Sequence, residues 1–84
     1  MKWPTWWHWD LELTPHLERR MEDRDFTEVD LRHMLETAKS LDPDWVEGRW
    51  VVGTRHHGQQ WEVVVEPDFD EELMVVVTAY AVES

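Results

Sequence analysis

Cysteine is absent from the sequence, and glycine is scarce, with 3 residues in a chain of 84. Without cysteine the chain has no disulfide, no thiolate ligand for zinc and no cysteine nucleophile. The few glycines form no phosphate-binding loop, and neither an HExxH nor a GxSxG motif occurs. We therefore expect no bound metal and no cofactor.

Positive charge is also scarce. Lys and Arg total 8 against 19 Asp and Glu, which gives a formal net charge of −11. This balance excludes a broadly basic surface for nucleic acid or for an anionic membrane leaflet. A protein partner that carries positive charge suits it better. At the same time, 42% hydrophobic residues and seven tryptophans are too many for a disordered acidic tail.

Long apolar runs are missing as well. No segment approaches the roughly 20 apolar residues that cross a membrane, and the start of the chain carries no small-residue cleavage site. We therefore expect a cytoplasmic protein with no membrane partner. The length of 84 residues, without an internal repeat or linker, predicts a single domain over residues 1–84.

The N-terminal segment predicts a tryptophan-rich strand over residues 5–13. Trp7 and Trp9 begin an apolar series that alternates with polar residues, which is the period of a half-buried strand. Trp6 and Trp3 fall outside this apolar series. We expect them to be exposed and to form an interface, for example in a homodimer.

Two helices are predicted next, over residues 15–24 and 28–39. The first follows a Thr-Pro pair, which supplies an N-cap and a first helical residue. Thr27 caps the second helix, with an acidic residue three positions later in a variant of the capping box. The apolar stripe of this second helix predicts that Leu31 and Leu35 are core residues.

The rest of the chain predicts an antiparallel meander over about residues 45–82, because it is rich in Val, Trp and Thr. His57-Gly58 is the predicted two-residue hairpin turn. The register that it sets predicts a helix-covered face made of alternate residues, which on the first two strands are Trp50, Val52, Thr54, His56, Gln59, Trp61, Val63 and Val65. A matching register on the last strand adds Met74, Val76, Thr78 and Tyr80.

These elements predict an α+β fold. Two N-terminal helices pack on one face of a three- to four-stranded antiparallel meander, with an extra N-terminal strand.

The first predicted helix carries a stripe of cationic side chains. His16, Arg20 and Arg24 are four residues apart and therefore share one side of the helix. Arginine forks suit phosphate, so the stripe is a candidate anion site. Surface ion pairs with neighbouring carboxylates are the alternative. Thr78 and Tyr80 would complete a site if the helix crosses their end of the sheet.

The remaining histidines and the tryptophans favour structural interpretations. His8 and His33 lie on the polar sides of their elements, and His56-His57 is more typical of a solvated turn than of a metal site or a general base. Stacking of RNA bases on the N-terminal tryptophans is disfavoured because acidic residues flank them. Core packing or a partner-binding surface is favoured.

Residues 16–27 resemble the opening signature of a family of small bacterial proteins that is known as a domain of unknown function. The shared pattern is His, three residues, Arg-Met, two residues, Arg, a glycine and an apolar residue, followed by a capped helix. Asp25 stands where the pattern has glycine. Residues 61–68 and 75–80 resemble the last two strands of the family, so the resemblance extends over about residues 11–82.

This family is similar in layout to the BrnT and RelE toxins, among the metal-independent ribonucleases related to barnase, colicin and EndoU domains. The resemblance implies a toxin-like endoribonuclease or a degenerate RNA-binding relative, with an antitoxin as a protein partner. It implies that His16, Tyr80 and Thr78 are catalytic and that Arg20 and Arg24 bind phosphate. The alternative is a non-catalytic acidic protein that binds a basic protein partner or self-associates through its tryptophan-rich surface.

Overall fold

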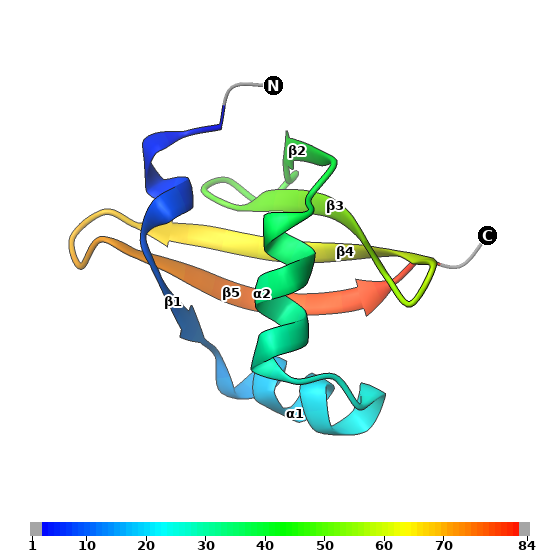
Figure 1. Cartoon of the computed structure of the whole chain (residues 1–84). Coiled ribbons are helices and arrows are strands. Elements are labelled where there is room, and N and C mark those ends of the chain that lie inside the picture. Colours follow the sequence, from blue (N-terminus) through cyan, green and yellow to red (C-terminus); the bar gives the residue numbers. More distant parts are fainter. Residues whose placement is uncertain (1–2, 83–84) are drawn as a thin grey trace.

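The structure, a computed structural model, describes residues 3–82 of the chain. Its elements are the 3-10 helix η1 (Thr5–His8), β1 (Asp10–Leu13), α1 (Pro15–Arg24), α2 (Glu28–Glu36), β2 (Ser40–Pro43), β3 (Trp50–His56), β4 (Gln59–Asp68) and β5 (Leu73–Ala81). The five strands form one sheet in the order β1-β5-β4-β3-β2 (Figure 1). The predicted α+β class is confirmed. The sheet is mixed, because β1 runs parallel to β5 while the other neighbours are antiparallel.

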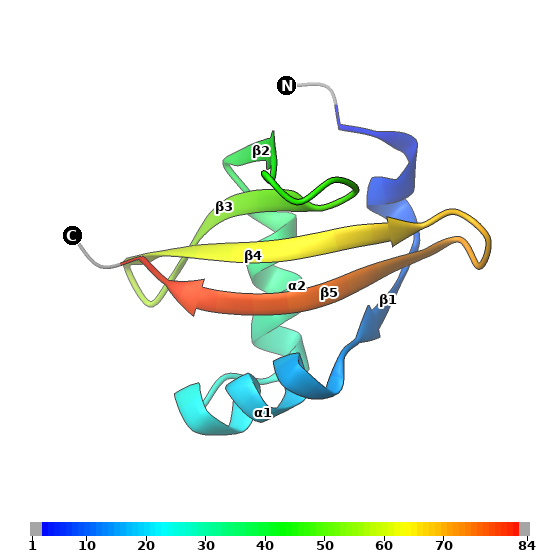
Figure 2. The ribbon, with the colours of Figure 1, turned by 180° about the vertical axis from the view of Figure 1, so that it is seen from behind.

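Both helices pack against the sheet. α2 crosses one face of the sheet, and α1 lies beside β5 near the start of α2 (Figure 1). The core between them comprises Trp6, Leu17, Phe26, Leu31, Met34, Leu35, Val52, Trp61, Val63, Val65, Met74, Val76 and Ala79. The prediction that Leu31 and Leu35 are core residues is confirmed. Within the described residues, no helix covers the reverse face of the sheet (Figure 2).

The helices begin where their caps predict. The Thr14 hydroxyl accepts a hydrogen bond from the Leu17 N–H at 3.1 Å, and α1 covers the predicted residues. Thr27 and Asp30 form a reciprocal capping box at the start of α2. α1 ends at Arg24, and the next residue, Asp25, caps it with a left-handed φ of 55°. Glycine adopts this conformation at less cost, which accounts for the glycine in the family pattern.

α2 ends three residues earlier than predicted, at Glu36 instead of residue 39. The reason is that the chain already joins the sheet there, since the Lys39 N–H donates to the Gly53 carbonyl of β3 at 2.7 Å. β2 follows at once and pairs with β3. Pro43 therefore lies in an edge strand, a position that a proline tolerates.

The predicted strand over residues 5–13 is wrong over its first half. The Trp7 N–H donates to the Pro4 carbonyl at 3.0 Å, which winds residues 5–8 into the 3-10 helix, and β1 begins only at residue 10. This turn points Trp6 into the core, where 5% of it is exposed and its ring lies 5.9 Å from that of Trp50. Trp3 stacks on Trp7 at 4.5 Å. The expectation that Trp6 is exposed at an interface is therefore wrong.

The hairpin prediction is confirmed. His57 and Gly58 both have left-handed backbone, with φ of 51° and 74°, as a tight two-residue hairpin turn requires. The turn pairs β3 with β4 in the predicted register, for example Thr54 with Trp61. Thr54 is 2% exposed, and its hydroxyl donates to the Met34 carbonyl at 2.6 Å. This bond joins β3 to the last turn of α2.

Candidate functional site

A β-bulge in β5 separates the residues that were expected to form one site. The pairing of β4 with β5 moves from Val65–Val76 directly to Val64–Thr78, so Val77 has no partner on β4. One extra residue moves every later side chain to the opposite face. Thr78 therefore lies with Val64 on the reverse face, and the expectation that it shares the helix-covered face is wrong.

Tyr80 is on the reverse face for the same reason, opposite Glu62, and its expected face is wrong as well. Its hydroxyl donates to the Glu62 carboxylate at 2.7 Å. That hydrogen bond, together with burial and the negative charge of Glu62, raises the pKa of Tyr80 to about 12. A phenol held protonated in this way is poorly suited to general acid–base work near neutral pH. The Thr78 hydroxyl oxygen is buried and has no hydrogen-bond partner within residues 3–82.

The cationic stripe on α1 remains accessible. His16 and Arg24 are exposed, and Arg20 is half-buried. The ion pairs found within residues 3–82 are Arg32–Glu28 and Arg49–Glu66. The alternative in which Arg20 and Arg24 are neutralised by neighbouring carboxylates thus finds no support in the described part of the chain. The stripe can receive an anion, but no hydrogen bond joins it there to Thr78 or Tyr80.

A second group of cationic side chains lies between α2 and the β3–β4 hairpin. It lines an open cavity of about 550 Å³, which we name the histidine cleft. Its lining residues are Asp30, His33, Thr37, Lys39, Arg55, His56, His57 and Gly58. Three of the five histidines of the chain therefore line one cavity together with a lysine and an arginine.

His56 is the most enclosed histidine of the cleft. Its ring lies 4.1 Å from that of His57 and 5.5 Å from that of Trp61. Burial lowers the pKa of His56 below 6.5, and so does the nearby His57, while Asp30 opposes this and His33 adds to it. His56 is therefore mainly neutral at pH 7 and can accept a proton.

Asp30 is the carboxylate of the cleft, and it is already engaged. It accepts the Thr27 N–H at 2.9 Å and the Thr27 hydroxyl at 3.1 Å. These bonds lower the pKa of Asp30 below 3.8. Its charge thus serves the N-terminus of α2, which leaves the cations of the cleft without a carboxylate within ion-pair distance among residues 3–82.

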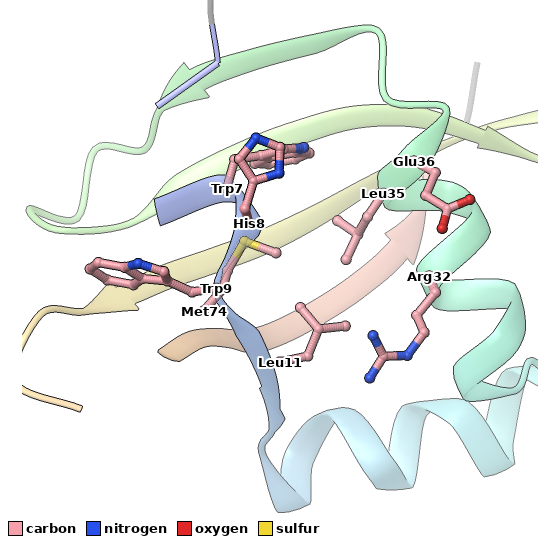
Figure 3. Close-up of a pocket in the computed structure, with 8 residues that line it drawn as sticks. All are labelled: Trp7, His8, Trp9, Leu11, Arg32, Leu35, Glu36 and Met74. Carbon is pink, nitrogen blue, oxygen red and sulfur yellow. The ribbon is translucent and has the colours of Figure 1, made fainter. Parts of the chain in front are cut away.

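An aromatic pocket lies on the other side of α2 (Figure 3). Its volume is about 330 Å³, and its lining residues are Trp7, His8, Trp9, Leu11, Arg32, Leu35, Glu36 and Met74. The guanidinium of Arg32 is 3.2 Å from the carboxylate of Glu28. Because this cation is already compensated, the pocket offers less to an anion than the histidine cleft does.

The histidine cleft was missed in the sequence because three separate segments build it. His33 is predicted on the polar side of a helix and His56-His57 in a solvated turn, and both descriptions are correct locally. The signal was present in the spacing of His33 and Thr37, which share one side of α2. It becomes a site only when α2 is placed over β3, and periodicity does not specify that placement.

The fold defines a small α+β domain with helices on one face of a mixed sheet and, among residues 3–82, no helix on the reverse face. The chain belongs to the family described as Domain of unknown function (DUF4258), which matches residues 13–81. The resemblance to a domain of unknown function is thereby confirmed. No curated protein and no solved structure matches the chain.

Two further properties concern the described residues. Within residues 3–82, no helix is long and apolar enough to cross a membrane. In the same part of the chain, no group of three or more His, Cys, Asp or Glu side chains is placed to hold a metal ion.

Proposed function

We propose that the protein is a toxin-like RNA-binding domain, related to the BrnT and RelE toxins, that contacts phosphate through the exposed side of α1. The observation that carries the proposal is that Arg20 and Arg24 lack a carboxylate partner within residues 3–82. The RNA-binding part of the proposal rests on the similarity in layout between this family and the BrnT and RelE toxins. In a chain of net charge −11, uncompensated arginines on one helix create a local positive potential.

The proposal favours binding over cleavage. Metal-independent cleavage needs a base for the 2′-hydroxyl and an acid for the leaving 5′-oxygen. His16 can supply one of these groups beside the two arginines. Thr78 and Tyr80, the candidates for the second group, lie on the reverse face. We therefore propose the degenerate, RNA-binding form, in which His16 donates a hydrogen bond to a phosphate oxygen.

The test is binding of a labelled single-stranded RNA, measured by fluorescence anisotropy over a range of salt concentrations. Arg24→Gln should weaken binding. It should also reduce the magnitude of the slope of log K against log salt concentration by about 0.7, the value for one lost phosphate contact on a single strand. Arg32→Gln makes the same charge change in an exposed ion pair and should have little effect. Equal weakening by both variants contradicts the proposal. Cleavage in EDTA that is lost in His16→Ala would restore the ribonuclease hypothesis.

A second candidate function is the binding of a basic protein partner, and one observation favours it. Trp45 is 93% exposed in the loop between β2 and β3. The same loop carries Asp44 and Glu47, and Asp42 lies at the adjoining end of β2, so an aromatic side chain projects from an acidic surface. Exposed aromatic rings are typical of interface anchors, and the carboxylates suit lysine and arginine on the partner.

This candidate is tested with a Lys- and Arg-rich peptide and with sedimentation. Trp45→Ser should weaken peptide binding, whereas loss of the exposed Phe69 in Phe69→Ser should not, because it lies in a different loop. A strict monomer that binds no basic peptide removes this function. A dimer that Trp45→Ser dissolves would identify the partner as a second copy of the chain.

A further inference from the structure

We propose that the histidine cleft is a binding site for a phosphate monoester group, and that His56 takes up a proton when the group binds. This inference does not depend on the RNA-binding function of α1. It concerns a different surface, between α2 and the β3–β4 hairpin, and a ligand that need not be RNA.

The cleft carries an excess of fixed positive charge. Lys39 and Arg55 both line it, and neither has a carboxylate within ion-pair distance among residues 3–82. The one carboxylate of the lining, Asp30, accepts hydrogen bonds from the N–H and the hydroxyl of Thr27. Two cations against one carboxylate leave a net positive charge that attracts an anion.

The guanidinium of Arg55 is held in place for such a ligand. Its Nη2 atom donates to the Gly58 carbonyl at 2.9 Å, across the tight turn of the hairpin. A guanidinium has five N–H donors, and this bond uses one of them. The anchored group keeps its remaining donors for phosphate oxygens.

His56 couples ligand binding to protonation. It faces Asp30 and His33 from α2, His57 from its own hairpin, and the apolar rings of Phe26 and Trp61. Burial and the two neighbouring histidines disfavour protonated His56, Asp30 favours it, and Lys39 and Arg55 line the same cavity. A bound dianion adds negative charge to this cavity and therefore favours the protonated ring. Binding should therefore raise the pKa of His56 and become tighter as the pH falls from 8 to 6.

The charge and size of the cleft favour a monoester. Lys39, Arg55 and a protonated His56 against the Asp30 carboxylate leave two positive charges, which match a dianion, whereas a phosphodiester or a carboxylate carries a single charge. The volume of about 550 Å³ also exceeds what a lone tetrahedral anion needs, so there is room for the organic group of an ester. Nucleotide 5′-phosphates and inorganic phosphate share the recognised group, and the experiment distinguishes them.

Sulfate is the first probe, because it is a tetrahedral dianion that does not titrate between pH 6 and 8. Amide and histidine-ring signals of the isotope-labelled protein are followed by NMR during a sulfate titration at pH 6, 7 and 8. We expect signals of His33, Arg55, His56 and His57 to shift together, with affinity about tenfold higher at pH 6 than at pH 8. Shifts confined to α1, or none in the cleft, overturn the proposal.

Variants then locate the site. Arg55→Gln should weaken sulfate binding about tenfold, the size expected for one charge-assisted hydrogen bond. Arg32→Gln, on the opposite side of α2, should leave it within twofold; equal weakening by both would show only a general charge effect and overturn the proposal. His56→Gln removes the imidazole that titrates and should reduce the pH dependence, with circular dichroism as the check that the fold is kept. An unchanged pH dependence refutes the proton uptake.

The source of the phosphate group is separated by a comparison of ligands. Adenosine 5′-monophosphate, inorganic phosphate and adenosine are titrated under the same conditions. Tighter binding of the nucleotide than of inorganic phosphate, with no shift caused by adenosine, identifies an ester. Equal affinity of the two phosphates identifies inorganic phosphate and overturns the assignment to a monoester. If Arg24→Gln loses RNA binding but keeps sulfate binding in the cleft, the two sites act independently.

Discussion

The hydrogen bond from Thr54 to the Met34 carbonyl should make one of the larger single contributions to the free energy of unfolding. The hydroxyl lies 2.6 Å from the carbonyl oxygen, Thr54 is 2% exposed, and Met34 is 0% exposed. Met34 is in the last turn of α2, where carbonyls have no partner within the helix. Thr54→Val keeps the shape of the side chain but removes the donor, so a buried carbonyl loses its partner.

A buried carbonyl left without a hydrogen bond costs about 1–3 kcal/mol. The new methyl group of valine and its preference for strands return part of this amount. We therefore expect Thr54→Val to lower the free energy of unfolding by about 1–2 kcal/mol. For a domain of this size, each kcal/mol corresponds to a fall in Tm of about 4–8 °C.

Thr37→Val is the matched control. The Thr37 hydroxyl also donates to a carbonyl of α2, that of His33, at 2.8 Å, but this bond is exposed and water can replace it. Its loss should cost less than about 0.5 kcal/mol. Urea unfolding followed by circular dichroism measures both variants, with the m-value as a check on two-state behaviour. Equal costs for the two variants would refute the reasoning, because burial would then make no difference.

Three other predictions test separate parts of the structure. The single tyrosine, Tyr80, should titrate near pH 12 in absorbance at 295 nm, and Glu62→Gln should bring the midpoint closer to 10. Since the fold favours the protonated phenol, stability from this group is complete below about pH 10 and is lost as the pH rises towards 12; a wild-type midpoint near 10 contradicts the bond. Asp25→Gly should stabilise the protein by about 0.5–1 kcal/mol in urea unfolding, because glycine adopts the left-handed cap with less strain; a loss of stability contradicts this. Thr78→Val should raise the unfolding free energy by about 1 kcal/mol, because it removes a buried hydroxyl that has no partner, and a variant that unfolds more easily would show that the hydroxyl is bonded.

Local signals predicted the local structure well. The Thr-Pro pair placed the start of α1, the capping box placed the start of α2, and His57-Gly58 fixed both the hairpin turn and the register of β3 with β4. Each of these depends on residues that are neighbours in the sequence. Backbone conformation and capping bonds are decided over a few residues, so the sequence can specify them.

These local signals do not predict contacts between segments that are distant in the sequence. The bulge at Val77 has no signature in a run of valines, yet it moved Thr78 and Tyr80 away from the expected site. The Thr14 hydroxyl donates to the carbonyl of Val77 at 2.9 Å, which joins the bulge to the cap of α1. Alternation of residue types predicts the faces of a strand only while its pairing is regular. The position of a bulge depends on tertiary contacts, which alternation does not specify.

The parallel pairing of β1 with β5 also sets the order in which the chain can assemble. Thr14 and Val77, which meet beside this pair, are 63 residues apart in the sequence, so closing this loop costs more entropy than closing any of the three antiparallel pairs β2–β3, β3–β4 and β4–β5. These pairs should therefore form in the folding transition state, and α1 should dock afterwards. During synthesis on the ribosome, Leu17 stays exposed until β5 has emerged and can cover it. A chaperone that binds exposed apolar side chains would meet the N-terminal third of the nascent chain throughout that interval.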